Sequence, residues 1–327
     1  MNNFMNKTLL LIFLLLLLFI NNLSAQVYEG VIKDNKGNVV PYVNIIFTDT
    51  HNDLFGVTTN SSGKFEIAKS FLVNADTIKF SCIGYQIKKI AKDDLSERKE
   101  NMICLAEKKY TLNEIVINDN KYKKRIITLG THKNKSDAGE YYPLWNEVAL
   151  YIPNNKKIDG YIKDVKIKLV NKTKSEVPIR IHVYGVTKLG DGPQDELLQK
   201  SVITSASSSH GKWIVADIEK YRIAFPPEGV FIGFEFIPPD GVNVTDTITE
   251  CVRMTTNDDK RLRVQRGFVR GNDQCYTWER YFRTNKLKKR GIVYKGWKWY
   301  YTGKKGYYHP NVGLTNVIMC ADVIFFK

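Results

Sequence analysis

The chain has 327 residues, of which 43% are hydrophobic, 12% aromatic and 25% charged. This composition is typical of an ordered globular protein and excludes an intrinsically disordered chain. The formal net charge of +15 would suit anionic partners, but lysine-rich solvated faces and a linker are the preferred explanation. None of the motifs of nucleic-acid-binding proteins is present, so no nucleic acid partner is expected.

Residues 1–25 are predicted to be a cleaved signal peptide. Lys7 precedes an unbroken apolar run over residues 9–20, and cleavage is expected between Ala25 and Gln26. The run is shorter than the roughly 20 residues that cross a bilayer, and no cysteine stands at the cleavage site. No later segment is apolar enough to span a membrane as a helix. We therefore expect an exported protein, periplasmic or associated with the outer membrane, with no transmembrane segment after cleavage.

Residues 26–108 carry ordered turn and strand signals. Asp34 to Gly37 predicts a tight turn in which Asp34 caps the backbone and Gly37 takes a positive φ. Pro41 should open a strand or lie on an edge, because proline cannot donate to a ladder. A second turn is expected over 60–63. Seven strands follow from the pattern: 27–33, 40–47, 54–58, 64–68, 76–82, 85–90 and 101–105.

Three of these stretches together resemble a known family. They read "GVIKDNKGNVVPYVNIIF", "GVTTNSSGKFEI" and "IKFSCIGY", and they are similar to the carboxypeptidase regulatory-like domain. This β-sandwich, Ig-like or transthyretin-like, precedes the plug in many TonB-dependent outer-membrane receptors and is not itself a peptidase. The chain departs from the usual pattern at Asn60, where Asp is common, and at Cys82, where an aromatic residue is common.

The segment "YTLNEIVIND", residues 110–119, resembles the part that joins this domain to the receptor plug. The remaining residues are too few for a plug and a barrel, so we do not expect a complete transporter. Residues 120–140 are lysine-rich with few apolar anchors, and we expect a linker over residues 109–140. Residues 141–327 are expected to form a second antiparallel β-sandwich of jelly-roll type, on these strand-like stretches: "EVALYI", "YIKDVKIKLV", "PIRIHVYGV", "KWIVADI", "GVFIGFEFI" and "VIMCADVIFF".

The sequence lacks the common motifs of zinc peptidases, serine hydrolases and structural zinc sites. No Glu follows three positions after any of the five histidines, which are His51, His132, His182, His210 and His309. No HExxH, GxSxG or CxxC occurs, so zinc proteolysis, a serine-hydrolase elbow and a structural zinc site are not expected. We predict a non-enzyme with no catalytic residues, no cofactor and no metal. The five cysteines cannot all pair, and burial of Cys82 and Cys104 is expected in preference to bridging.

Glu235 is the best single candidate for a functional carboxylate. It interrupts the apolar stretch "GFEF", and in a cleft its pKa would be perturbed. The competing interpretation is simple strand alternation, with Glu235 facing water. A glycosidase would need a second carboxylate about 5–10 Å away.

The stretch "YKGWKWYYTGKKGYYHP", residues 294–310, is the candidate binding segment. If it is a strand, Trp297, Trp299 and Tyr301 share one face and Lys298 lies on the other. Such rings could stack on sugars, with lysines beside them for acidic groups, or they could stack on nucleic-acid bases. The alternative is that one aromatic face is buried in the core.

Two classes of function remain open from the sequence. The first is a non-enzymatic, exported cell-envelope protein that works as a binding or scaffold module, with an envelope protein or a glycan as its partner. The second is a protein that binds or hydrolyses carbohydrate through the C-terminal sandwich.

Overall fold

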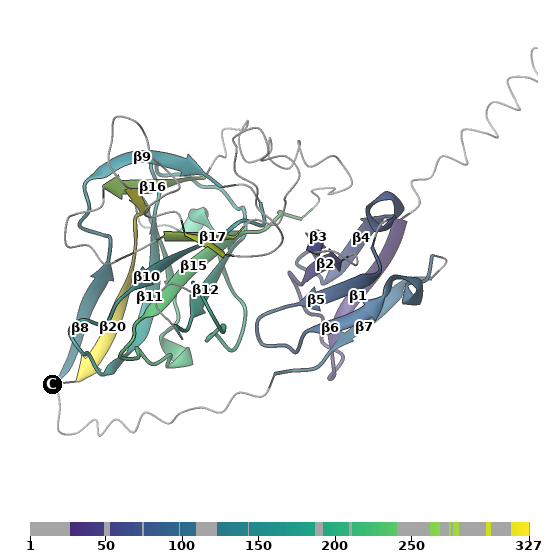
Figure 1. The fold of residues 1–327 in the computed structure, drawn as a ribbon, viewed down its shortest axis with the longest axis horizontal. Helices are drawn as coiled ribbons and strands as arrows, with labels where there is room; N and C mark the ends of the chain where they lie inside the picture. Colours follow the sequence, from purple (N-terminus) through teal and green to yellow (C-terminus); the bar gives the residue numbers. More distant parts are fainter. Residues whose placement is uncertain are drawn as a thin grey trace, which may run out of the picture.

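The computed structural model shows two β-rich bodies of unequal size, side by side (Figure 1). The structure describes residues 27–48, 53–73, 75–97, 99–108, 123–142, 144–186, 192–208, 211–240, 262–268, 275, 277–280, 299–301 and 315–326. Within these ranges the strands are joined by loops and short 3₁₀-helices, with no α-helix. None of the helices in the described ranges is long and apolar enough to cross a membrane. The predicted signal peptide lies outside the described residues.

The smaller body is a sandwich of two sheets. Its strands are β1 (Val27–Asp34), β2 (Asn44–Thr48), β3 (Asp53–Thr58), β4 (Lys64–Ala68), β5 (Thr77–Ser81), β6 (Lys88–Ala91) and β7 (Asn101–Leu105). One sheet has the order β4-β1-β7 and the other β3-β2-β5-β6. All pairs are antiparallel except β1 with β7, whose parallel register runs from Gly30↔Asn101 to Asp34↔Leu105.

Both predicted turns are confirmed. The Asp34 carboxylate accepts the backbone N–H groups of Lys36 and Asn38 at 2.8 and 2.9 Å, and Gly37 has a φ of 85°. The second turn, 60–63, is built in the same way around the Asn60 side chain. These side-chain caps replace ladder bonds where the chain reverses.

The strand alternation also follows the sequence, with two corrections. Strand β4 matches its predicted bounds, and its side chains alternate between exposed and buried. Strand β2 begins at Asn44 and not at residue 40, because Pro41 and Tyr42 form a turn in which Tyr42 has a φ of 54°. The prediction that Pro41 opens or edges a strand is therefore wrong. Strand β6 begins at Lys88 and not at 85, after a turn at Gly84 with a φ of 95°.

The larger body contains three sheets. Their orders are β13-β12-β15-β10-β17-β18, β14-β11-β20-β8 and β19-β16-β9. The strands are β8 (Lys124–Gly130), β9 (Ser136–Tyr141), β10 (Glu147–Ile152), β11 (Gly160–Lys168), β12 (Ile179–Tyr184), β13 (Val202–Thr204), β14 (Trp213–Asp217), β15 (Val230–Phe236), β16 (Arg263–Phe268), β17 (Thr277–Arg280), β18 (Trp299–Tyr301), β19 (Thr315–Val317) and β20 (Met319–Phe326). The prediction of an all-β protein with a second sandwich is confirmed.

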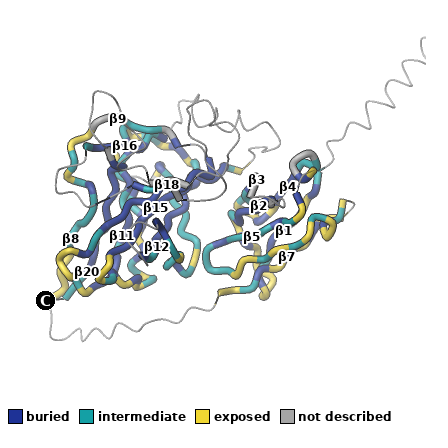
Figure 2. The backbone as a smooth tube through the Cα atoms, in the orientation of Figure 1, coloured by how far each residue is buried: buried dark blue, intermediate teal, exposed yellow. Residues whose placement is uncertain are grey.

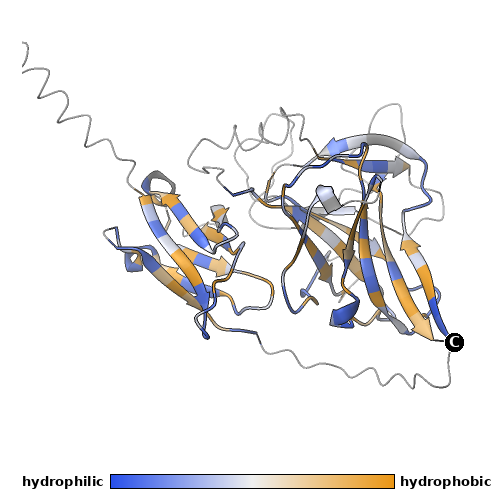
Figure 3. Ribbon diagram, turned by 180° about the vertical axis from the view of Figure 1, so that it is seen from behind, coloured by the Kyte–Doolittle hydropathy of each residue, from blue (hydrophilic) through white to orange (hydrophobic). Residues whose placement is uncertain are grey.

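The core of the larger body lies between its six-stranded and four-stranded sheets. Alternate residues of β10 and β15, such as Leu150 and Phe234, meet residues of β11 and β20, such as Val165 and Val323, in one buried cluster. Figure 3 shows the corresponding hydrophobic bands along these strands. Strands β10 and β15 are buried along their whole length (Figure 2), so the opposite face of the six-stranded sheet is covered as well.

The predicted linker over 109–140 is wrong from Lys124 onward. Strand β8 pairs with β20 over seven residue pairs, and β9 pairs with β16. The reason lies in Ile127 and Leu129, which pack against the core although lysines surround them in the sequence. Residues 109–122 lie outside the described residues.

The cysteines of the described ranges are free thiols. Cys82, Cys275 and Cys320 are buried, whereas Cys104 is exposed. The predicted burial of Cys82 is confirmed. The predicted burial of Cys104 is wrong, because β7 alternates and Cys104 falls on its outward face. Cys251 lies outside the described residues.

Candidate functional site

Charged side chains gather on the outer face of the six-stranded sheet. Glu235 on β15 lies opposite Glu147 on β10 and Arg180 on β12. His182 shares this face, because residues two apart on a strand point the same way. The exposed fraction is 0% for Glu235, 1% for Arg180, 2% for Glu147 and 4% for His182. We call these four residues, together with Tyr184 and Glu196, which bond to them, the buried charged cluster.

Arg180 and Glu235 form the central ion pair of the buried charged cluster. The Arg180 Nη1 atom is 2.8 Å from Oε2 of Glu235. The Asn44 side chain, from the first sandwich, donates to Oε1 of Glu235 at 3.3 Å. Both oxygens of this carboxylate therefore accept hydrogen bonds, which a buried charge requires.

His182 is held at one ring nitrogen. Its Nδ1 atom is 2.7 Å from Oε2 of Glu196, and its ring stacks on Tyr184 with centroids 5.2 Å apart. Its Nε2 atom is buried without a hydrogen-bond partner and lies 3.6 Å from Oε2 of Glu235. Burial acts to lower the pKa of His182, but the charges of Glu147, Glu196 and Glu235 outweigh it and raise this pKa to about 9.

Tyr184 holds the remaining carboxylate. Its hydroxyl donates to Oε2 of Glu147 at 2.7 Å. The described carboxylates of the cluster, Glu147, Glu196 and Glu235, are thus each oriented by a named neighbour. Fixed orientation of this kind is what metal sites and ion-pair networks both require.

The first sandwich covers the buried charged cluster. The Tyr42 carbonyl accepts a short hydrogen bond from Nη2 of Arg180, beside the Asn44 contact to Glu235. Cys82 lies close enough for the Arg180 and Glu235 charges to act on it, and burial raises the pKa of its thiol. We call the contacts between the two sandwiches the domain junction.

Further hydrogen bonds extend the domain junction. The Trp145 indole N–H donates to Oγ1 of Thr58 at 2.7 Å, and the Ser61 backbone N–H donates to Oδ1 of Asp240 at 2.9 Å. Gly84 approaches the backbone of the second sandwich so closely that an added Cβ would lie 2.6 Å from the Gln199 carbonyl oxygen. Only glycine allows this contact, and it also supplies the positive φ of the turn.

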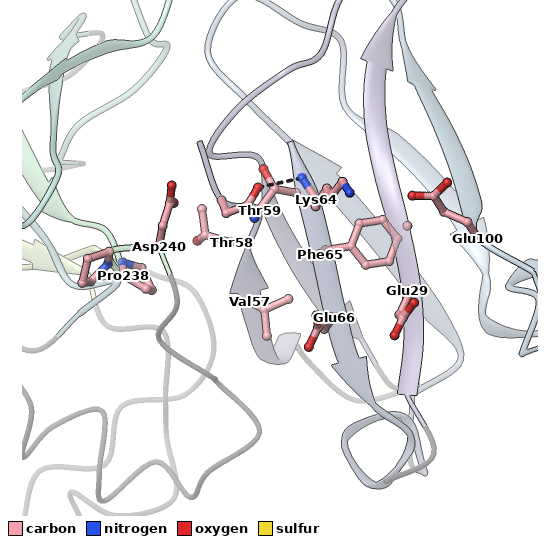
Figure 4. A pocket seen from close by; sticks show the side chains of 13 residues that line it. Glu29, Val57, Thr58, Thr59, Lys64, Phe65, Glu66, Glu100, Pro238 and Asp240 are labelled. Carbon is pink, nitrogen blue, oxygen red and sulfur yellow. Dashed lines mark hydrogen bonds between the residues drawn. The ribbon is translucent and has the colours of Figure 1, made fainter. Parts of the chain in front are cut away.

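A groove of about 400 Å³ opens beside the domain junction (Figure 4). Strands β1, β3 and β4 form one side of it, and residues 238–240 of the second sandwich form the other. Its carboxylates come from Glu29, Glu66, Glu100 and Asp240. Glu29 and Glu66 are exposed cross-strand neighbours on β1 and β4. Such a groove can accept a polar or cationic ligand.

The structure changes the picture of the predicted site residues. Glu235 faces neither a cleft nor water, so both predicted environments are wrong. The first sandwich covers the face that alternation assigns to solvent. Trp299 and Tyr301 lie on β18, which pairs with β17 at the end of the six-stranded sheet. Trp297 and Lys298 lie outside the described residues.

Sequence analysis did not identify Glu147, Arg180, His182 or Glu196 as site residues. A signal was nevertheless present in two stretches, "EVALYI" and "IRIHVY", which place Glu147, Arg180 and His182 on one side of otherwise apolar strands. Their meeting depends on the order of β12, β15 and β10 in the sheet, which the stretches do not encode.

The architecture is that of a small seven-stranded sandwich fastened to a larger one. Residues 28–117 match the family model of the CarboxypepD_reg-like domain. The first sandwich is therefore a carboxypeptidase regulatory-like domain, and the match ends before the second sandwich begins. A search of curated proteins finds no match to the chain.

Proposed function

We propose that the chain is an exported, non-enzymatic cell-envelope protein, in which a carboxypeptidase regulatory-like domain and a second sandwich act together as a binding or scaffold module. The observation that carries the proposal is the domain junction. Arg180 and Glu235 of the second domain bond to Tyr42 and Asn44 of the first, in a buried environment. Side chains that would otherwise suit catalysis thus connect the two domains.

The groove beside the domain junction is the place where this module would bind its partner. Both domains contribute to its walls, so its shape depends on their relative position. Its polar lining suits an envelope protein with a basic segment, or a glycan. Glu29 and Glu66 are exposed and lie side by side, which makes them the natural first positions to alter.

Export is tested by locating the full-length chain in cells and determining the N-terminus of the mature protein. The proposal expects the protein outside the inner membrane, beginning at Gln26. The matched variant places two arginines within residues 9–20 and should remain in the cytoplasm, uncleaved. A wild-type chain that stays in the cytoplasm with Met1 would contradict the proposal.

Binding is tested with purified protein on arrays of glycans and of envelope-derived peptides. The double variant Glu29→Gln/Glu66→Gln keeps the side-chain shapes and removes two charges from the groove. Binding by the wild type that the variant loses would support the groove. Turnover of a substrate by the wild type would contradict the non-enzymatic assignment.

The second candidate is a protein that binds or hydrolyses carbohydrate through the C-terminal sandwich. It is favoured by the position of Trp299 and Tyr301 on β18, at the end of the strand order. The variant Trp297→Ala/Trp299→Ala distinguishes the two candidates. Glycan binding that this variant loses, and the groove variant keeps, would assign binding to the aromatic strand.

A further inference from the structure

We propose that Glu147, His182 and Glu235 form a buried site for one divalent transition-metal ion such as Zn²⁺, beneath the carboxypeptidase regulatory-like domain. One ligand atom from each of the three residues can be chosen so that all lie within 4.8 Å of one another. Imidazole nitrogen and carboxylate oxygen are both ordinary zinc ligands. The three residues come from adjacent strands, in the order β12, β15 and β10.

His182 is arranged as a metal-binding histidine. A ligating histidine commonly donates its other ring N–H to a carboxylate, which fixes the ring and raises its basicity. Glu196 fills that role at Nδ1, at 2.7 Å. The Nε2 atom, on the opposite side of the ring, is buried without a hydrogen-bond partner. A buried polar atom of this kind calls for an explanation, and a metal ion bound at Nε2 in place of the proton that faces Glu235 provides one.

The two carboxylates are positioned by neighbouring groups. Tyr184 donates to Glu147 at 2.7 Å, and Arg180 and Asn44 donate to Glu235 at 2.8 and 3.3 Å. Hydrogen bonds to ligating carboxylates are a regular part of metal sites. Asn44 belongs to the first domain, so an ion held by Glu235 would stabilise the domain junction.

The charges of the described side chains also suit a divalent cation. With the ion bound in place of the Nε2 proton, His182 is neutral, Glu147, Glu196 and Glu235 contribute three negative charges, and Arg180 contributes one positive charge. One divalent ion brings this group to neutrality, which matters because uncompensated charge is costly in a buried site. Since the described parts of the site are covered by protein, we assign the ion a structural role.

The test is a Zn²⁺ titration of the full chain, purified as the cell produces it and first treated with a chelator. Calorimetry should show one tightly bound Zn²⁺ per chain. His182→Gln should weaken binding by about 100-fold or more, and Glu196→Gln by about 10- to 100-fold through loss of the orienting carboxylate. His132→Gln is the matched control, since His132 lies outside the cluster, and it should bind Zn²⁺ as the wild type does.

Folding is followed separately by circular dichroism, because an unfolded variant would also lose Zn²⁺. Thermal melts give a second readout: Zn²⁺ should raise the Tm of the wild type and of His132→Gln. The absorption of Co²⁺ bound to wild-type protein gives a third, which requires no variant and should show ligation by one nitrogen with oxygens. A wild-type chain that binds no Zn²⁺ overturns the site, and so does equal binding by a folded His182→Gln chain.

Discussion

The outer faces of the two large sheets in the second sandwich carry similar charges in different surroundings. On the six-stranded sheet, Arg180 and Glu235 are covered by the first domain. On the four-stranded sheet, Lys166 pairs with Asp322 at 2.6 Å, and their side chains are 23% and 13% exposed. Figure 2 shows intermediate and exposed colouring toward β8, where that sheet ends.

The difference shows that the contribution of a charge to stability depends on whether another part of the protein covers it, and not on its place in the strand alternation. An ion pair that water can reach contributes little, because solvent screens it. A covered pair loses its hydration, so removal of one partner leaves an uncompensated charge. The two outer faces should therefore respond very differently to single substitutions.

The largest effect is expected at the covered face. Arg180→Met should lower the free energy of unfolding by about 3–5 kcal/mol, because Glu235 would remain buried after losing the guanidinium that bonds its Oε2 atom. Urea denaturation at pH 7 measures this. The double variant Arg180→Met/Glu235→Leu should recover most of the loss. A single substitution costing less than about 1 kcal/mol would show that water reaches this face.

A smaller effect is expected at the open face, and it should depend on pH. Burial acts to raise the pKa of Asp322, but Lys166 and the Thr128 hydroxyl, which donates at 2.6 Å, keep this pKa below its usual value. A lowered carboxyl pKa stabilises the fold above the unfolded-state pKa, and the benefit is lost as the pH falls through the folded-state pKa.

Asp322→Asn should therefore cost about 1–2 kcal/mol at pH 7 and nothing once the pH is below the folded-state pKa. Part of the cost is offset because Asp322 helps to raise the pKa of the neighbouring Asp164. Denaturation curves over a pH series measure the trend. A cost that is the same at all pH values would assign the effect to packing.

A substitution at the domain junction should have an effect of about 1 kcal/mol. Thr58→Val removes the acceptor of the Trp145 indole N–H and the hydroxyl that donates to Oδ1 of Asn44 at 3.1 Å, while keeping a β-branched side chain suited to β3. Thermal unfolding followed by circular dichroism measures the change. An unchanged Tm would mean that water replaces the Thr58 hydroxyl and that this side of the junction is wet.

The smallest effect is expected for an exposed ion pair. Lys124 and Glu219 are 3.0 Å apart, with side chains 50% and 28% exposed. Lys124→Ala should change the free energy of unfolding by less than about 1 kcal/mol. The same denaturation assay, repeated at high salt, should show wild type and variant converging. A larger loss would mean that the protein shields this pair from water, as it shields the pair on the six-stranded sheet.

Much of the fold could be predicted from the sequence. Alternation gave the bounds of β4 and β7, and turn chemistry at Asp34 and Asn60 set the reversals between strands. Strand β8 was missed because lysines surround its short apolar stretch. Its pairing with β20, almost two hundred residues later in the chain, is a tertiary contact that the local sequence does not indicate.

The candidate site was only partly predictable. Glu235 stood out as a charge within an apolar strand, but its partner Arg180 and the covering Asn44 are far from it in the chain. Alternation distinguishes the two faces of a sheet, and it does not say whether a second domain lies against the outer one. A polar face can be assigned to solvent only when it is known that no other domain or molecule covers it.

The parallel pairing of β1 with β7 has a mechanical consequence. These are the first and last strands of the carboxypeptidase regulatory-like domain, and their register joins five residue pairs. A tensile load applied at Val27 and Leu105 would pull the two strands along their length in opposite directions. All the hydrogen bonds between them would then carry the force together, in shear, instead of opening one after another. A domain stretched between the envelope and a bound partner would resist extension best along this axis.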